Sequence, residues 1–127
     1  MKHVLLVGIG GFIGAVLRYS VSGWVQSWTR SVRFPYGTLT VNVLGSLIIG
    51  ILLELAEGRS AFGPEARALL VIGLLGAFTT FSTFSSETLN LLQNGENLAA
   101  GLNLVVQVTM GLAAVWGGRA LVQGLWR

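Results

Sequence analysis

The chain has 127 residues, of which 53% are hydrophobic and 10% are charged. Soluble domains carry about 25% charged residues, so this composition indicates a membrane protein. The net charge is +3, but the basic residues do not cluster, so we expect no nucleic-acid partner. The chain has no cysteine, which excludes disulfides and cysteine metal sites.

Four apolar segments are long enough to cross a lipid bilayer, for which about 20 residues are needed. They cover residues 4–25, 36–56, 68–92 and 98–122. The connectors between them are short and polar, and two of them carry Pro35 or Pro64, as expected between spans. We therefore predict an all-α membrane protein with a single four-helix transmembrane domain over residues 1–127.

Small residues recur four positions apart in two of the segments. Gly10 and Gly14 form such a pair in the first segment, and Gly73 and Ala77 form one in the third. Because small side chains at this spacing let helices approach closely in lipid, we interpret these residues as helix-packing positions.

Arg18, Asn42 and Glu87 are polar residues inside the spans. A charge in the membrane costs about 2.5 to 3.5 kcal/mol on insertion scales, so such groups usually face a cavity or a partner. Arg18 either extends back to the membrane surface or lies at a pore mouth, and Glu87 either caps the aqueous end of its helix or has a functional role. Asn42 lies deep in the second segment, where its amide either bonds two helices together or offers donors to a ligand.

The third segment contains "GAFTTFSTFSSET", residues 76–88, in which seven of the residues are Thr or Ser. Plotted at about 100° per residue, the hydroxyl and aromatic residues separate onto two faces. One face holds Thr79, Ser82, Thr83 and Ser86, and the opposite face holds Phe81, Phe84 and Ser85. Two faces of different chemistry suggest two roles, although an aromatic pair at this spacing is also typical of a core.

Hydroxyl residues after a glycine also favour a locally unwound segment, because their side chains bond backbone groups and compete with the helix. Carbonyls freed at membrane depth must meet protein, water or an ion. A break over residues 76–79 is therefore a candidate cation site. The alternative is an unbroken helix whose hydroxyls bond their own preceding turn.

The basic residues give only a weak signal for the orientation of the chain. Four spans place both termini and the second connector on one side, which carries Lys2, Arg59, Arg67, Arg127 and, near the end of a span, Arg119. The other side carries Arg30, Arg33 and, inside a span, Arg18. Because the usual cytoplasmic excess of basic residues is small, the chain either inserts one way or inserts both ways and pairs as an antiparallel dimer.

Three motifs follow one another along the chain: "GGFIGAVLRY" in the first segment, "FPYGTLTVNVLGS" at the start of the second and "GLLGAFTTFSTFSSET" in the third. With these motifs the chain resembles the Fluc (CrcB) family of small fluoride channels over nearly its whole length. The resemblance implies an antiparallel, dual-topology homodimer of four-helix subunits, with a break in the third helix and two pores lined by both subunits.

The resemblance also implies roles for individual residues. The fluoride pore would be lined by Asn42, Phe81, Phe84 and Ser85, with Arg18 near its entrance. The backbone carbonyls of Gly76 and Thr79 from both subunits would hold one structural Na⁺ on the twofold axis. Glu87 matches the acidic residue that follows the hydroxyl run in the family.

Elementary chemistry supports an anion path of this kind. Fluoride is small and strongly hydrated, so a dry pore must replace its water with close amide and hydroxyl donors. Phe rings present a weakly positive edge that can touch an anion without holding it. In the fourth segment family members often have Tyr and then Ser, where this chain has Asn103 and Gln107, so we expect the polar lining to differ in detail.

We therefore expect a channel and not an enzyme, located in the cell's inner (plasma) membrane and conferring fluoride resistance. An inside-negative potential favours outward movement of an anion by about 2.3 kcal/mol per 100 mV. One alternative is a small proton-coupled multidrug transporter, but that mechanism needs a carboxylate deep in the first segment, where the only charged residue is Arg18. Another alternative is a membrane scaffold whose polar residues only bond helices together.

Overall fold

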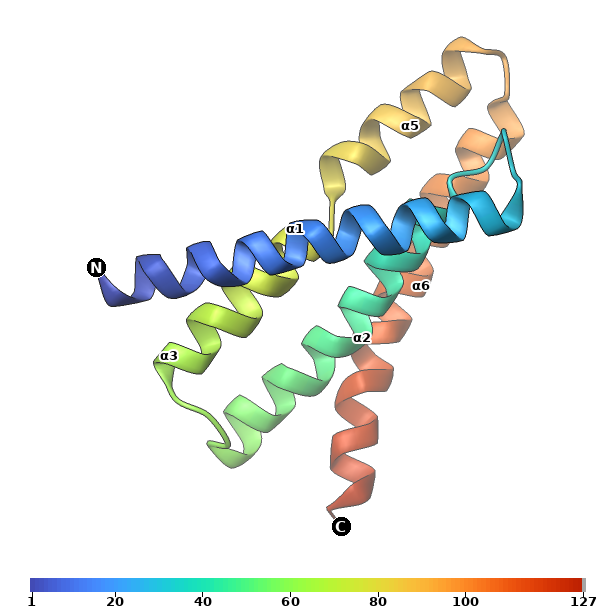
Figure 1. The fold of residues 1–127 in the computed structure, drawn as a ribbon. Coiled ribbons are helices and arrows are strands. Elements are labelled where there is room, and N and C mark those ends of the chain that lie inside the picture. The colour runs from blue at the N-terminus through green and yellow to red at the C-terminus, as the bar shows by residue number, and fades with distance from the viewer. Residues whose placement is uncertain (127) are drawn as a thin grey trace.

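A computed structural model describes residues 1–126, without the side chain of Arg59, and shows helices joined by short connectors over this range (Figure 1). In chain order the helices are α1 (Lys2–Thr29), α2 (Tyr36–Arg59), α3 (Pro64–Arg67), the π-helix η1 (Ala68–Leu75), α4 (Gly76–Phe78), α5 (Phe81–Gln93) and α6 (Asn97–Leu125). The elements α3, η1 and α4 follow one another without a connector. The predicted all-α fold is confirmed.

Four helical stretches within the described residues are long and apolar enough to cross a membrane: Lys2–Thr29, Tyr36–Gly58, Pro64–Gln93 and Asn97–Leu125. They match the four predicted spans, and each extends further at one or both ends. The first stretch continues to Thr29 because the left-handed conformation comes only at Arg30, where φ is 50°. The third begins at Pro64, whose fixed φ and missing N–H suit the first turn of a helix.

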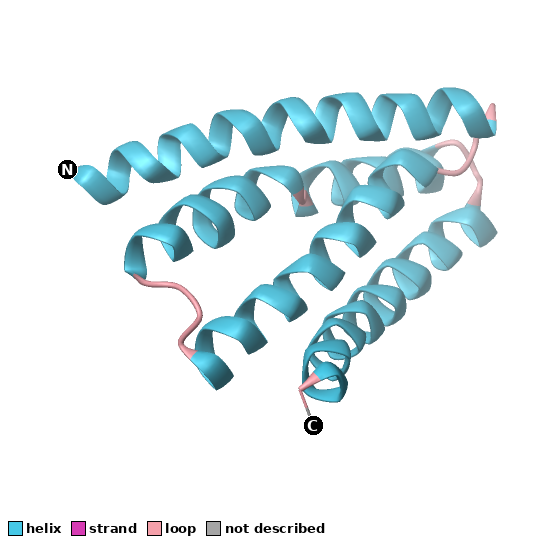
Figure 2. Ribbon diagram, turned by 60° about the horizontal axis from the view of Figure 1, so that its bottom comes forward, coloured by secondary structure: helices cyan, strands magenta, loops and turns pink. Residues whose placement is uncertain are grey.

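The long helix α1 lies along one side of the other helices (Figure 2). It packs mainly against η1, whereas α2 packs mainly against α6. The α1–α2 and α5–α6 connectors lie at one end of the molecule, and the N-terminus, the α2–α3 connector and the end of α6 lie toward the other (Figure 1). This arrangement fits four spans that cross a bilayer in alternating directions.

Glycines determine how closely these helix pairs approach. Gly10 and Gly14 on α1 are buried against η1, and a methyl group added to either would overlap the backbone of η1. Gly73 on η1 faces α1 in the same contact. Gly50 on α2 and Gly118 on α6 allow a similar approach between those two helices. The packing role predicted for Gly10, Gly14 and Gly73 is therefore confirmed.

Most large apolar side chains lie on the outside of the single chain. The buried apolar cluster is small and consists of Val41, Leu75 and Phe78. By contrast, Phe12, Leu112 and many other apolar residues are exposed. Soluble monomers rarely expose apolar patches of this extent, so the outer surface suits lipid or a second copy of the chain.

Candidate functional site

The third span is interrupted at Thr79 and Thr80. Both residues have extended backbone, with ψ 157° at Thr79 and φ −151° at Thr80. The chain resumes a helix at Phe81, and the Thr80 side chain caps this new helix by accepting a hydrogen bond from the Thr83 amide at 3.2 Å. A break was predicted over residues 76–79. The break is confirmed, but it starts later, because Gly76 is still helical.

The later position of the break changes the two faces expected from the helical plot. That plot assumed one continuous helix and placed Thr79 with Ser82, Thr83 and Ser86. Because the helix ends before Thr79 and restarts at Phe81, Thr79 belongs to neither face of α5. Its hydroxyl instead donates to the Leu75 carbonyl at 3.1 Å.

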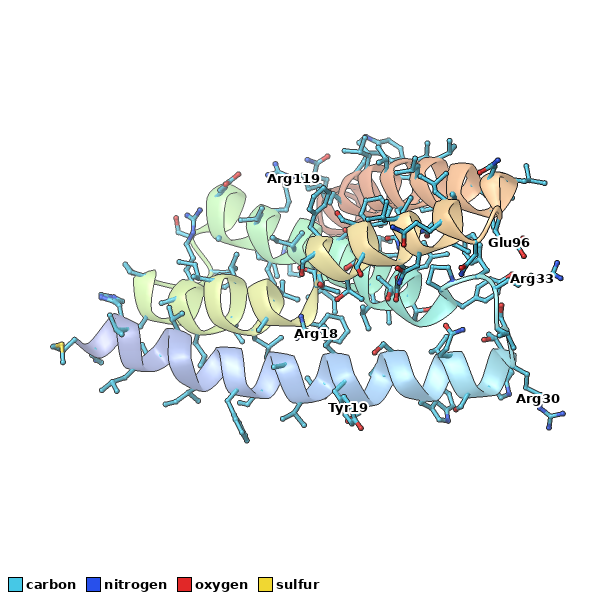
Figure 3. The ribbon with its side chains drawn as sticks, turned by 90° about the horizontal axis from the view of Figure 1, so that it is seen from above. Arg18, Tyr19, Arg30, Arg33, Glu96 and Arg119 are labelled. Carbon is cyan, nitrogen blue, oxygen red and sulfur yellow. The ribbon has the colours of Figure 1, made fainter. Side chains whose placement is uncertain are left out.

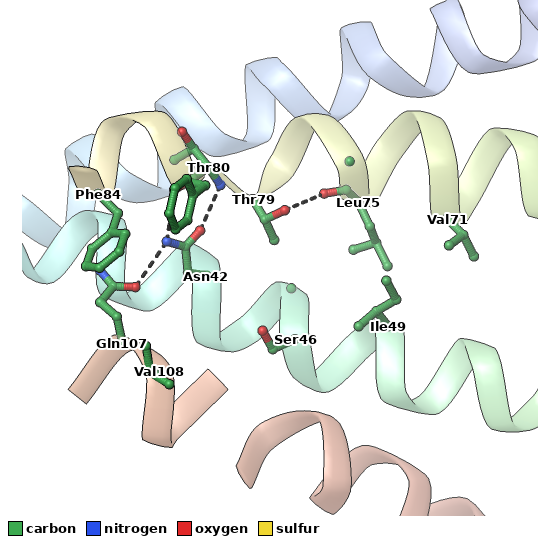
Figure 4. A pocket seen from close by; sticks show the side chains of 13 residues that line it. Asn42, Ser46, Ile49, Val71, Leu75, Thr79, Thr80, Phe84, Gln107 and Val108 are labelled. Atoms are coloured by element: carbon green, nitrogen blue, oxygen red, sulfur yellow. Dashed lines mark hydrogen bonds between the residues drawn. The ribbon is translucent and has the colours of Figure 1, made fainter. Parts of the chain in front are cut away.

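Asn42, on the neighbouring helix α2, stabilises the break through hydrogen bonds. Its Nδ2 donates to the Thr80 carbonyl at 3.1 Å, and its Oδ1 accepts from the Thr80 amide at 2.8 Å (Figure 4). One side-chain amide thus pairs with both backbone groups of a residue that has left the helix. Because unpaired backbone groups are costly when buried, this contact stabilises the extended conformation of Thr80.

The break leaves two carbonyls without their helical donors. In a continuous helix the amide of Thr80 would donate to the Gly76 carbonyl, and the amide of Thr83 would donate to the Thr79 carbonyl. Here these amides donate to Asn42 Oδ1 and to the Thr80 hydroxyl instead. Gly76 and Thr79 therefore lose their usual helical donors, and both residues line a cavity beside the break.

This cavity, which we call the central cavity, has a volume of about 350 Å³. It brings together five of the residues selected from the sequence, and these are Asn42, Gly76, Thr79, Phe81 and Phe84. The rings of Phe81 and Phe84 meet edge to face, with 5.5 Å between their centroids. Phe84 is 7% exposed whereas Phe81 is 78% exposed, so the cavity is open on the side of Phe81.

Two further predicted site residues lie outside the central cavity. Ser85 is exposed, and its hydroxyl donates to the Phe81 carbonyl at 3.0 Å. Arg18 is half-buried and points from α1 toward the start of α5, whereas the adjacent Tyr19 points away (Figure 3). It lines a smaller cavity of about 180 Å³, the Arg18 cavity, which shares Thr80 with the central cavity.

A chain of hydrogen bonds extends from Asn42 along α6 and α5. Asn42 Nδ2 donates to Gln107 Oε1 at 3.1 Å, and Gln107 Nε2 donates to Asn103 Oδ1 at 3.5 Å. Asn103, which is fully buried, donates to the Thr88 hydroxyl at 2.9 Å, and that hydroxyl donates to the Phe84 carbonyl at 2.7 Å. Asn103 and Gln107 thus form a polar track that meets both Asn42 and Phe84.

The sequence carried a signal for this track that the prediction used only in part. Asn103 and Gln107 lie one helical turn apart in an apolar span, so they share a face of α6. At both positions the chain departs from the residues that are usual in the family. Their shared face could also have predicted that they bond each other and a polar partner on another helix.

A third cavity, which we call the outer cavity, lies at the end of the molecule that holds the α1–α2 and α5–α6 connectors. Its volume is about 420 Å³, and its lining includes Thr38, Thr83 and Glu87. Glu87 Oε1 accepts from the Thr38 hydroxyl at 2.7 Å. Glu87 Oε2 is buried and has no hydrogen-bond partner among the described residues. The Glu87 side chain therefore lies against α2 and beside a cavity.

The chain is similar to known proteins over nearly its whole length. A family model described as "CrcB-like protein, Camphor Resistance (CrcB)" matches residues 5–119. The chain belongs to the CrcB family. This match confirms the family that the three sequence motifs indicated.

The chain is also similar to relatives of about the same length. "Fluoride-specific ion channel FluC 1" of Methanosarcina acetivorans is 51% identical over 119 residues, which cover 94% of this chain and 89% of the relative. "Fluoride-specific ion channel FluC" of Shewanella amazonensis is 50% identical over 122 residues, with 96% and 97% covered. "Fluoride-specific ion channel FluC 3" of Methanosarcina barkeri is 43% identical over 125 residues, with 98% and 93% covered. Membership of the CrcB family and the four apolar helices identify a multi-pass membrane protein.

Proposed function

We propose that this protein is a fluoride-selective ion channel that lowers cytoplasmic fluoride by passive efflux, and that it is not an enzyme. The observation that carries the proposal is its full-length similarity to proteins named fluoride-specific ion channel. The geometry supports it, because Asn42, Phe81 and Phe84 line one cavity whose polar and aromatic groups suit a small anion.

In the central cavity fluoride would make weak contacts, and it would form one of them by replacing a hydrogen-bond acceptor that is already present. Both Asn42 Nδ2 hydrogens are engaged, one by the Thr80 carbonyl and one by Gln107 Oε1. In our proposal the anion replaces the Gln107 oxygen on Asn42 and touches the ring edges of Phe81 and Phe84. Conduction requires contacts that are strong enough to admit the ion and weak enough to release it, and an exchange of one acceptor for another meets this requirement.

The proposed pathway also includes residues at the edge of the central cavity. Arg18 would attract the anion near the pore entrance from its neighbouring cavity, which shares Thr80 with the central one. Ser85 lies on the exposed side of α5, on the same side as Phe81, and would line the pore where a second subunit covers this helix. Two pores would then run along the dimer.

We further propose that the chain acts as an antiparallel, dual-topology homodimer. Phe81 and Gly76 line the central cavity but are exposed in the single chain, so a second copy would complete the wall of the cavity. The weak charge bias of the connectors permits insertion in both orientations. Oppositely oriented copies would pair about a twofold axis in the membrane plane, which is the symmetry of inverted repeats in larger transporters.

One structural Na⁺ would lie on that axis. The carbonyls of Gly76 and Thr79 have lost their helical donors, and carbonyls of unwound segments are suitable ligands for Na⁺ in membrane proteins. Two carbonyls from each copy would bind the ion, which would supply a fixed positive charge between the subunits. Prolonged exchange of Na⁺ for a large organic cation should lower dimer stability or fluoride flux. If neither changes, the assignment of Gly76 and Thr79 is wrong.

In cells the channel would work in the inner (plasma) membrane. Hydrogen fluoride crosses membranes uncharged and dissociates in a more alkaline cytoplasm, and the inside-negative potential then drives the anion out, by about 2.3 kcal/mol per 100 mV. The test is growth on fluoride of a strain without its own fluoride exporter. Expression of this protein should restore growth, whereas a non-transporting scaffold would leave the strain as sensitive as the empty vector.

A further inference from the structure

An ion pair lies beside the outer cavity, at the end of the molecule that holds the α1–α2 and α5–α6 connectors. Arg33 Nε lies 3.4 Å from Glu96 Oε1, which joins the α1–α2 connector to the α5–α6 connector. Figure 3 shows both side chains at this end, with Arg30 pointing away from them. Arg33 is the only lysine or arginine that lines the outer cavity in the described part of the chain.

The connector that carries Arg33 is held in a fixed shape. Gln26 Nε2 donates to the Ser31 carbonyl at 2.6 Å and to the Phe34 carbonyl at 3.2 Å, and Gln26 Oε1 accepts from the Gly37 amide at 3.1 Å. These bonds bracket Arg33 on both sides. The backbone of Arg33 is therefore held at the edge of the outer cavity.

The ion pair itself is weak. It is a single 3.4 Å contact, and the Arg33 and Glu96 side chains are 79% and 36% exposed. Exposed pairs with one contact hold each other only loosely, and arginine keeps its charge at all physiological pH values. The Arg33 guanidinium can therefore exchange Glu96 for another anion without any movement of the connector.

The outer cavity is connected to the groups already described. It shares Ser22, Thr38 and Thr83 with the Arg18 cavity, which in turn shares Thr80 with the central cavity. An anion that enters at Arg33 thus meets hydroxyl groups and then Arg18 before it reaches Asn42. The half-buried Glu87 side chain beside Thr38 would repel the anion when it is ionised. A positive charge at the edge of the outer cavity would therefore help the anion to enter.

We propose that Arg33 collects anions at the outer end of the fluoride path and that Glu96 limits its strength by competing for the guanidinium. The inference rests on the proposed channel function and adds a residue to it. Removing Glu96 raises the net charge at this edge by one, whereas removing Arg33 lowers it by one. The two members of one ion pair therefore act on conduction in opposite directions.

The experiment is single-channel fluoride conductance in planar bilayers for Arg33→Gln, Glu96→Gln and the double variant. At about 0.01 M salt, where charges act over about 30 Å, Arg33→Gln should lower the conductance about twofold and Glu96→Gln should raise it about twofold, since a charged cleft changes local ion concentration. The double variant should return close to the wild type. At about 1 M salt, where charges act over about 3 Å, all four proteins should conduct alike.

Arg30→Gln is the matched control, because it removes the same charge from the same connector at a residue that does not line the outer cavity. It should change the conductance less than Arg33→Gln does. If Arg33→Gln and Glu96→Gln both lower the conductance, the ion pair only holds the two connectors together, and the proposal is overturned. The proposal is also overturned if neither variant changes the conductance. A wild-type protein without fluoride conductance would instead refute the channel function itself.

Discussion

The contact between Asn42 and the helix break allows a sharp test with Asn42→Asp. The substitution keeps the size of the side chain and the acceptor that faces the Thr80 amide. It replaces Nδ2, which donates to the Thr80 carbonyl and to Gln107 Oε1, each at 3.1 Å. An oxygen would then face two other oxygens. We expect both a less stable break and a negative charge beside the anion path.

The structure permits an estimate of both effects. Each buried acceptor that loses its donor costs about 1 to 3 kcal/mol, so the two lost bonds destabilise the fold by about 2 to 6 kcal/mol in total. The new carboxylate, ionised and about 4 Å from fluoride, would raise the energy of the ion by about 4 kcal/mol at an effective dielectric constant of about 20. That energy corresponds to about a thousandfold lower occupancy.

The assay is fluoride efflux from liposomes, with the elution profile of the purified protein as a check on assembly. Gln93→Glu is a suitable control, because it adds the same charge at an exposed residue that lines none of the three cavities. We expect efflux to be lost in Asn42→Asp and kept in the control. Undiminished efflux through a normally assembled Asn42→Asp protein would remove Asn42 from the mechanism.

Two further predictions concern the framework of the site. Gly14→Ala should destabilise the fold by about 1 to 3 kcal/mol, as overpacking does, because the new methyl group overlaps the backbone of Leu74. The control is Gly8→Ala, whose methyl group meets nothing within 4 Å and should not destabilise the fold. Equal thermal unfolding of the two variants would contradict the packing role of Gly14. Thr80→Ala should cost about 1 kcal/mol by removing the hydroxyl cap on the Thr83 amide, and Thr80→Ser should keep most of it. If the serine and alanine variants unfold alike, the cap does not stabilise α5.

The sequence was sufficient for the features that depend on local composition. Four apolar segments predicted four spans, and the spacing of Gly10 and Gly14 predicted a close helix contact, because both signals are contained in one helix. The break was also predicted, since hydroxyl residues compete with helical hydrogen bonds. Its start was placed at Gly76 and not at Thr79, because local propensity alone does not fix which residue leaves the helix.

The contacts that fix the break could not be predicted in the same way. Asn42 reaches Thr80 across 38 positions of the chain and reaches Gln107 across 65, so these contacts depend on the rotation of three helices relative to one another. The Arg33 and Glu96 pair likewise forms only because two connectors meet at one end of the bundle. The spacing of Asn103 and Gln107 indicates a polar partner on another helix, but composition and spacing do not determine which residue that partner is.

The most direct test of the central claim is ion efflux from liposomes that contain the purified protein, measured for fluoride and for chloride under the same gradient. Our account predicts rapid fluoride efflux, and chloride efflux no faster than from protein-free liposomes. Fluoride efflux at the protein-free level, or equal efflux of the two anions, would contradict it.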